Sequence, residues 1–353
     1  MMKNIITDNI SVRGYSHIRE DKECQDSSLC WQTDSYAAVI VCDGHGGDKY
    51  IRSATGSAIA CEIGKRAIDE FMGRIYKKKP FSFGTYASAI NVTNSDKLLS
   101  QLERSIIAAW NEQTKKSCDI SPLDTDERWE TLSDADKRSL EKTPQKAYGS
   151  TFLAGVISYD FCFLLKLGDG NANVIKSDEL VYSPEELADD ALQFNLTSSL
   201  CNSDADVAFR HYFAEIPKDE ERRICGIALS SDGVINCFRS PEAYCSFIKN
   251  VYTAYGEEEA EDARRELSEA LAVFSERGSG DDLSIALIRQ KISEKAREQT
   301  KQKKTADGKD SASADASAKP IAKKPSCSRC IHRNKCKRRK HKKGAFLRRI
   351  FKI

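Results

Sequence analysis

The sequence predicts an α+β fold in which two antiparallel β-sheets stack face to face and helices flank them. Short apolar runs typical of buried strands gather in blocks, and longer stretches of helical periodicity separate the blocks. Within the middle block the gaps between runs are short enough for antiparallel hairpins. Elements grouped in this way favour a sandwich with flanking helices over a doubly wound parallel sheet.

The first block holds three expected strands, followed by two long helices. The strands lie at residues 10–15, at residues 27–32 and in the run that begins at Tyr36. The helices lie at residues 51–72 and 97–114, where apolar side chains recur at helical spacing. We expect each helix to bury one apolar face.

The rest of the fold continues this grouping. Residues 117–146 are polar and are expected as a surface excursion with one short helix that opens at Ser133. Residues 184–215 lack a clear period, and we expect a mobile flap there. Further strands are expected at 151–158, 162–168, 173–177, 179–183, 224–229 and 283–288, and further helices at 241–255 and 259–274.

The composition is that of a soluble globular protein. Its 353 residues, 40% hydrophobic and 31% charged, suffice for one large domain or two ordinary ones, and we expect a monomer. No apolar stretch approaches the ~20 residues that span a bilayer, and no secretory segment opens the chain. We therefore expect a cytoplasmic, reducing location and small core thiols instead of disulfides. The cysteines in or beside apolar runs are Cys24, Cys30, Cys42, Cys61, Cys162, Cys225 and Cys237.

Charge divides the chain into unlike parts. Residues 323–353 hold fourteen Lys or Arg and no acid, so residues 1–322 carry about −12. Between them lies a stretch rich in Ala, Ser, Lys and Asp with little to bury. We expect a folded domain over residues 1–290, a flexible linker over 291–325 and a basic tail over 326–353.

Several apolar runs end or begin at acidic residues beside glycine. They do so at Asp43, Asp169 and Asp232, and at the pair Asp281 and Asp282. A single aspartate at a strand end most often forms a turn or caps a helix. Four such places together predict an oxygen-rich pocket for Mg²⁺ or Mn²⁺, because gathered carboxylates repel one another without a counter-charge.

Six motifs within about the first 290 residues carry a family resemblance. In chain order they are CQDS, VCDGHGG, YGSTF, KLGDGNA, LSSDGV and GSGDDLS. The set resembles the metal-dependent serine/threonine protein phosphatases of type 2C. The resemblance implies a two-sheet sandwich, a binuclear Mg²⁺ or Mn²⁺ centre at one end, hydrolysis of phosphoserine or phosphothreonine in proteins by metal-activated water, and a role in signalling.

The resemblance also implies roles for single residues. His45 matches the general acid, and Asp26 matches the acid that holds metal-bound water. The implied metal ligands are Asp43, which bridges two ions, the Gly44 carbonyl, Asp232, Asp281 and, for a third and looser ion, Asp169.

Two positions depart from the family pattern. Gln25 stands where the family commonly has Glu, which removes one negative charge beside the second metal. The phosphate-binding arginine normally lies five residues before the position of Asp26, whereas Arg19 lies seven before it. Arg19 is the candidate, with His17 and Arg13 as competitors and an exposed, solvated arginine as the plain alternative.

The basic tail contains a second candidate metal site. Its ligands would be Cys327, Cys330, His332 and Cys336, a set that suits tetrahedral Zn²⁺; free thiols in a disordered tail are the alternative. The chain then continues as KRRKHKKGAFLRRIFKI, in which apolar residues 346, 347, 350 and 351 follow a cationic run at helical spacing. Such an end suits an anionic membrane or an acidic protein, and less well a nucleic acid. Fold-back onto the acidic domain and plain solvation are the remaining alternatives.

Three functions remain open from these patterns. The favoured one is a protein phosphatase. The second is a catalytically silent phosphatase fold that binds phosphoproteins, and the third is an adaptor that acts through the basic tail. The joint presence of Asp43, Asp232 and Asp281 favours the enzyme over the silent fold.

Overall fold

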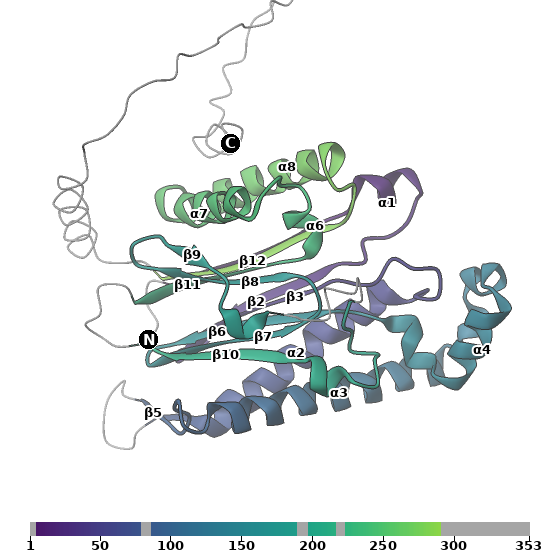
Figure 1. Ribbon diagram of the computed structural model, residues 1–353, viewed down its shortest axis with the longest axis horizontal. Helices are drawn as coiled ribbons and strands as arrows, with labels where there is room; N and C mark the ends of the chain where they lie inside the picture. The colour runs from purple at the N-terminus through teal and green to yellow at the C-terminus, as the bar shows by residue number, and fades with distance from the viewer. Residues whose placement is uncertain (1–4, 79–85, 189–196, 217–222, 291–353) are drawn as a thin grey trace, which may run out of the picture.

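The structure is a computed structural model that describes residues 5–78, 86–188, 197–216 and 223–290 (Figure 1). Two five-stranded antiparallel sheets stack face to face, and a pair of long helices covers the outer face of each (Figure 1). The predicted fold class is therefore confirmed. Within the described residues, no helix is both long enough and apolar enough to cross a bilayer.

The first sheet joins the two ends of the described chain. Its strand order is β1-β12-β11-β8-β9, and helices α7 (Pro241–Glu257) and α8 (Ala260–Arg277) lie over it. Its strands are β1 (Ile5–Val12), β8 (Asn171–Lys176), β9 (Val181–Tyr182), β11 (Ile224–Ser230) and β12 (Leu283–Gln290).

The second sheet has the order β10-β7-β6-β3-β2 and lies against the other helix pair, α2 (Ser53–Ile75) and α3 (Ser95–Ile120). Its strands are β2 (Ser27–Gln32), β3 (Tyr36–Cys42), β6 (Phe152–Ser158), β7 (Phe161–Leu167) and β10 (Arg210–Glu215). A separate hairpin pairs β4 (Tyr76–Lys78) with β5 (Tyr86–Ser88). The short helices are α1 (Tyr15–Arg19), η1 (Leu123–Thr125), η2 (Glu127–Thr131), α4 (Asp134–Lys142), η3 (Pro144–Tyr148), η4 (Glu185–Leu187), α5 (Ala205–Ala208) and α6 (Asp232–Ile235).

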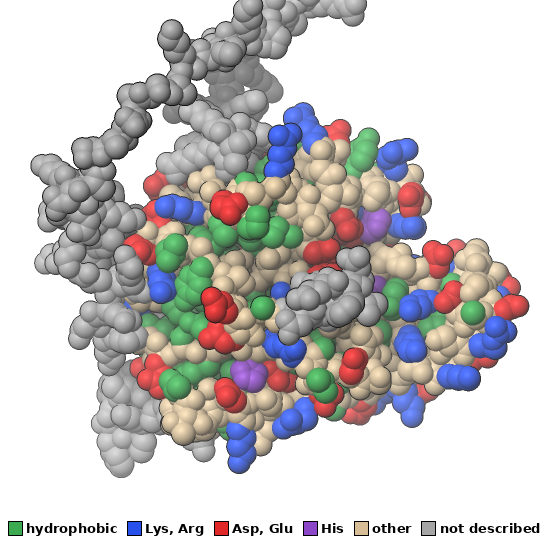
Figure 2. All heavy atoms as spheres, viewed as in Figure 1, with side chains coloured by type: hydrophobic (Ala, Val, Ile, Leu, Met, Phe, Trp, Pro, Cys, Tyr) green, Lys and Arg blue, Asp and Glu red, His purple; other side chains and the backbone are tan. Residues whose placement is uncertain are grey.

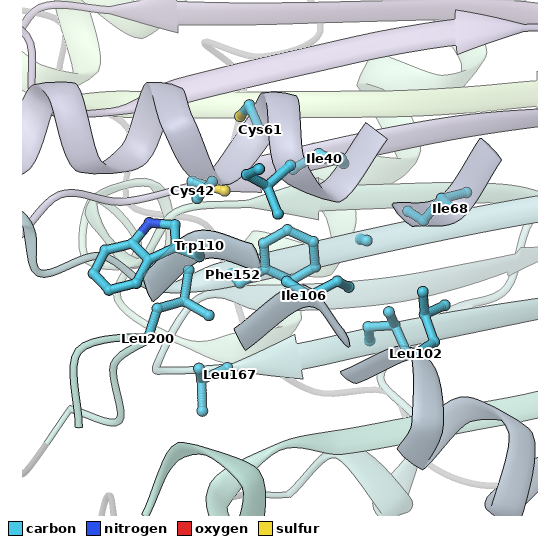
Figure 3. Close-up of a cluster of buried hydrophobic side chains, with 14 of the residues drawn as sticks. Ile40, Cys42, Cys61, Ile68, Leu102, Ile106, Trp110, Phe152, Leu167 and Leu200 are labelled. Carbon is cyan, nitrogen blue, oxygen red and sulfur yellow. The ribbon is translucent and has the colours of Figure 1, made fainter. Parts of the chain in front are cut away.

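Three apolar layers hold these elements together. One lies between the sheets and includes Val39, Leu164 and Ile227. A second lies between the first sheet and its helices, and a third lies between the second sheet and α2 and α3. Figure 3 shows the third layer, where Trp110 and Ile106 of α3 face the side chains of the second sheet. Burial on both faces explains why the central strands are continuous apolar runs.

Most predicted elements occur within a few residues of their expected bounds, but three expectations are wrong. The strand expected at 10–15 ends at Val12, and Tyr15 begins α1. Part of the flap expected at 184–215 is β10, which pairs with β7. The short gap at residues 169–171, between the strands expected at 162–168 and 173–177, does not form a hairpin, because β7 and β8 lie in different sheets. Gly168, at a φ of +107°, turns the chain from one sheet to the other.

Two smaller expectations can be compared with the structure. Ser133 caps α4 as predicted, since its side chain accepts a hydrogen bond from the Asp136 amide. Every described cysteine is free, but only part of the predicted core set is buried. Cys42, Cys61, Cys162 and Cys225 are buried, whereas Cys24, Cys30 and Cys237 are partly exposed. The linker, the basic tail and the zinc set at Cys327, Cys330, His332 and Cys336 lie outside the described residues and stay predictions.

A contact between a histidine and a glutamate links the second sheet to its helices. The Nδ1 atom of His211 in β10 lies 2.8 Å from a carboxylate oxygen of Glu103 in α3, and Glu103 is 4% exposed. Asp96, at 3.5 Å from Nε2, is the second acid beside the ring. The hydrogen bond to Glu103 raises the pKa of His211 above its ordinary value of 6.5, against the opposing effect of burial.

This pair predicts a pH-dependent contribution to stability. Because the pKa of His211 is raised in the folded state, its contribution is full below pH 6.5 and is lost as the pH rises through the folded pKa. We expect His211→Leu to lower the free energy of unfolding by about 1 to 3 kcal/mol in acid and by less near pH 9. Urea unfolding at both pH values measures this difference. Asp96→Ala removes only the second, exposed acid beside the ring and should have a smaller effect in acid. An equal loss in His211→Leu at both pH values would contradict the prediction.

Candidate functional site

Five acidic side chains gather at one end of the sandwich. Asp26 precedes β2, Asp43 follows β3, Asp169 joins β7 to β8, Asp232 opens α6 and Asp281 precedes β12. Each one either shifts the pKa of at least one other through its charge or has its own pKa shifted in this way, which places the five carboxylates near one another. Figure 2 shows acidic side chains where the two layers meet beside α1. We call these five residues the aspartate cluster.

The YGSTF motif holds the loop that carries Asp43. The backbone N–H of Asp43 donates to Oγ1 of Thr151 at 2.9 Å, and the N–H of Thr151 donates to the Asp43 carbonyl at 2.8 Å. Gly44 then pairs with Ser150 as an isolated β-bridge, and the His45 N–H donates to the Gly149 carbonyl at 3.1 Å. The backbone of Asp43 is thus held by the segment 149–151, which leads into β6.

Gly44 sits where no side chain fits. A Cβ atom there would lie 2.6 Å from the Gln25 carbonyl oxygen and 2.7 Å from the Ser53 carbonyl oxygen. Both contacts are with backbone, which cannot move aside cheaply. The glycine therefore lets three segments of the site approach one another.

Gln25 connects these segments through hydrogen bonds. Its carbonyl accepts from the Gly44 N–H at 3.2 Å and from the Ser57 hydroxyl at 2.6 Å. Its side-chain Nε2 donates to Ser53 Oγ at 2.8 Å and to the His45 carbonyl at 3.4 Å. An ionised glutamate has no N–H to donate to the His45 carbonyl. The side-chain amide of Gln25 therefore makes a contact with the His45 loop that a glutamate could not make. Its effect on the affinity of a second metal stays a prediction.

Burial and mutual repulsion act on the protonation of the aspartate cluster. Burial, followed by the charge of Asp282, raises the pKa of Asp26 to about 7. Burial and the neighbouring acids raise the pKa of Asp43 well above its usual range. The pKa values of Asp232 and Asp281 are also raised, chiefly by burial. The folded protein therefore resists the fully ionised state of this cluster.

The cluster has no basic ion-pair partners among the described residues. In the parts of the chain that the structure describes, no Lys or Arg forms an ion pair with any of its five members. The buried Oδ2 atom of Asp26 has no hydrogen-bond partner there either. Among the same residues, no three His, Cys, Asp or Glu side chains close around a single point as ligands. An oxygen-only, negatively charged and uncompensated pocket fits a hard divalent cation, although its ligands are not arranged around one.

His45 and Asp169 lie on the side of the cluster near the YGSTF loop. The His45 ring packs against Tyr50 with ring centres 4.7 Å apart. Burial lowers the pKa of His45 to about 4, although the charge of Asp169 acts in the opposite direction. One carboxylate oxygen of Asp169 accepts a hydrogen bond from the Thr197 hydroxyl at 2.6 Å. His45 is consequently neutral at pH 7 in this environment.

The residues near α1 differ in burial. Arg19 is exposed at the end of α1, and its role in phosphate binding stays a prediction. His17, two residues earlier, is largely buried, with Nδ1 3.0 Å from Oδ1 of Asp282. The sequence offered Asp282 only as one half of an acidic pair, and its contacts across the fold were missed. The adjacent acids in GSGDDLS were the available signal.

Comparison with known proteins agrees with this architecture. The family model described as Protein phosphatase 2C matches residues 13–272. A bacterial serine phosphatase has a similar structure, with a TM-score of 0.52 and 12% identity over 82% of this chain and 99% of that chain. The structure of PppA from Pseudomonas aeruginosa is similar with a TM-score of 0.50, 12% identity and the same coverage. At this identity the structures share the fold, and no curated protein sequence matches the chain.

The crowding at Gly44 gives a prediction about stability. We expect Gly44→Ala to lower the free energy of unfolding by about 1 to 3 kcal/mol, because the added methyl group meets two backbone carbonyls. Gly73→Ala in α2 is the matched control, since nothing lies within 4 Å of its added Cβ atom. An alanine in a helix is favoured over glycine, so that control should stabilise the protein by up to about 1 kcal/mol. Equal effects of the two substitutions in urea unfolding would contradict the crowding at Gly44.

Proposed function

The chain belongs to the protein phosphatase 2C family, and we propose that it hydrolyses phosphoserine and phosphothreonine in proteins with Mg²⁺ or Mn²⁺ as cofactor. The supporting observation is the aspartate cluster, which brings five acids from separate segments together without a Lys or Arg ion-pair partner among residues 5–78, 86–188, 197–216 and 223–290. Retaining such a cluster costs stability through repulsion and lost hydration. A catalytically silent fold that only bound phosphoproteins would be better served by cationic side chains, which attract phosphate.

The cluster provides the ligands that the cofactor requires. We assign Asp43, the Gly44 carbonyl, Asp232 and Asp281 to two ions, with Asp169 at a third and looser one. When bound, such ions lower the pKa of a water molecule and neutralise charge on phosphoryl oxygens. The chain itself fixes the positions of its ligands through the hydrogen bonds of Thr151 and Gln25.

Two further residues act on protons in this proposal. The unpartnered Oδ2 atom of Asp26 is available to accept a hydrogen bond from a water molecule and orient it. His45, held against Tyr50, is the candidate proton donor to the leaving hydroxyl. Because burial keeps its ring neutral at pH 7, His45 must gain this proton in the substrate complex, where the phosphate adds negative charge.

The first test of this function is metal-dependent turnover of a phosphopeptide. We expect Asp43→Asn and Asp232→Asn each to lower turnover by more than ~10²-fold, which exceeds the loss of one weak acid-base group, because each displaces a cation. Exhaustive chelation should abolish turnover, and added Mn²⁺ or Mg²⁺ should restore it.

Asp69→Asn is the control for these variants. Asp69 accepts hydrogen bonds from Trp31 and from Tyr36, which begins β3, so it lies at the end of that strand opposite to Asp43. We expect this variant to retain turnover. Near-native rates in metal-free protein, or in either cluster variant, would overturn the proposed reaction. Phosphopeptide binding without any turnover would favour the silent fold.

We also propose that the basic tail recruits the enzyme to an anionic membrane surface. The tail lies outside the described residues, so the support is its sequence, with fourteen basic residues over 323–353 and an apolar stripe near its end. Basic residues close to such a surface contribute about 1 kcal/mol each, and salt screens them. Nucleic acid and an acidic protein remain alternative partners.

Liposome sedimentation tests the tail in the full-length chain. We expect binding to anionic vesicles at low salt, less binding at high salt, and little binding to zwitterionic vesicles. A variant with the basic residues of 337–343 changed to Gln should lose most of this binding. Equal sedimentation of both proteins would contradict recruitment. Higher phosphatase activity of the variant without vesicles would instead favour fold-back of the tail onto the active site.

A further inference from the structure

Asp282 is a buried acid beside the cluster that uses both of its oxygens within the protein. It is 3% exposed. Its Oδ1 atom accepts a hydrogen bond from the Gly14 N–H at 2.5 Å, and its Oδ2 atom accepts one from the Gln25 N–H at 2.6 Å. These two contacts reach across more than 250 residues of sequence, from the residue before β12 to the segments on either side of α1.

His17 completes the surroundings of this carboxylate. Its Nδ1 atom is buried and lies 3.0 Å from Oδ1 of Asp282, within the distance of an ion pair, and it forms no hydrogen bond to a described group. The helix that carries it is anchored on the same loop, because the Ser16 N–H donates to the Gly280 carbonyl at 2.9 Å. Among the described residues, the one basic side chain within ion-pair distance of Asp282 is thus the histidine of α1.

The contacts of Asp282 leave its neighbour Asp281 as the available ligand. Three groups, the two amides and the imidazole, already face the Asp282 oxygens. The carboxylate of Asp281 accepts the N–H of Asp282 at 2.9 Å through one oxygen, Oδ1. The two adjacent acids therefore have different surroundings, and only Asp281 belongs to the aspartate cluster.

Asp282 also joins segments that each carry a member of the site. Gln25 precedes Asp26, and its carbonyl accepts the Gly44 N–H. Asp282 itself follows Asp281. Fixing one carboxylate between Gly14, His17 and Gln25 therefore fixes the spacing between the Asp26 segment, the Gly44 loop and the Asp281 loop.

We propose that Asp282 and His17 are a positioning pair that sets the affinity of the aspartate cluster for its divalent cation, without either residue touching the cation. The inference rests on the proposed function, since it concerns the same cation site. Residues that orient metal ligands from outside the coordination sphere typically change metal affinity by about 10- to 100-fold when they are removed. In this chain, Asp282 and His17 orient the segments that carry Asp281 and Asp26.

The test measures Mn²⁺ binding to the full-length protein by electron paramagnetic resonance, without substrate. We expect Asp282→Asn and His17→Leu each to raise the dissociation constant for Mn²⁺ by about 10-fold or more. The amide of Asp282→Asn turns an N–H toward the Gln25 N–H or the Gly14 N–H, and leucine offers no polar atom to Asp282. His17→Asn, which keeps a side-chain N–H near the position of Nδ1, should restore most of the affinity.

A matched control separates positioning from general destabilisation. The pair of His211 and Glu103 is also a buried histidine–carboxylate contact, but it lies between β10 and α3. His211→Leu should lower the melting temperature without changing the affinity for Mn²⁺. At saturating Mn²⁺ the kcat of His17→Leu should recover toward that of the wild type, whereas Asp281→Asn, which removes a ligand, should not recover.

The outcomes distinguish this inference from the proposed function. If the wild-type chain binds no Mn²⁺, the proposed function fails. If the wild-type chain binds Mn²⁺ and the variants at positions 17 and 282 bind it equally well, only the positioning pair is overturned. Loss of affinity in His17→Leu that is matched by His211→Leu, or that His17→Asn does not rescue, would also overturn it.

Discussion

Carboxylates that are buried beside one another must either be protonated or bind a cation. This constraint applies to the end of the sandwich where the aspartate cluster lies. The pKa values of Asp26, Asp43, Asp232 and Asp281 are all raised there. The fold could relieve the repulsion with Lys or Arg, but the described ion pairs lie elsewhere. The apolar layers beneath must therefore provide enough stability to hold an unfavourable arrangement of charge in place.

Backbone hydrogen bonds, more than side-chain packing, determine where these carboxylates stand. Thr151 holds both sides of the Asp43 peptide, Gln25 holds the Gly44 loop, and Asp282 holds the segment around Gln25. Each of these groups lies one or two residues before the first residue of a strand. The rigid sheets thus bring the chain to the site, and a few polar groups at their ends fix the final spacing.

The sequence allowed the fold class and four of the five acids of the aspartate cluster to be predicted, because both depend on local patterns, whereas Asp26 was implied only by the family resemblance of its CQDS motif. Buried strands are recognised as short apolar runs, and an acid beside glycine at a strand end can be identified directly from the sequence. The sheet to which a strand belongs is not a local property, so the crossing after β7 was missed, and the partly buried β10 lacked a clear period. The partners of Gln25, His17 and Asp282 were equally hidden, since they are set by contacts between distant segments.

The pairing of the first described strand with the last has a consequence for biosynthesis. Ile5 lies opposite Gln290 in the register of β1 and β12, so β1 leaves the ribosome long before its neighbour exists. Until then, one edge of β1 stays without its sheet partner, and Asp281 has not yet joined the acids that precede it in the chain. Nascent and prematurely terminated chains consequently lack a complete centre. The aspartate cluster is therefore complete only after nearly the whole described domain has been synthesised.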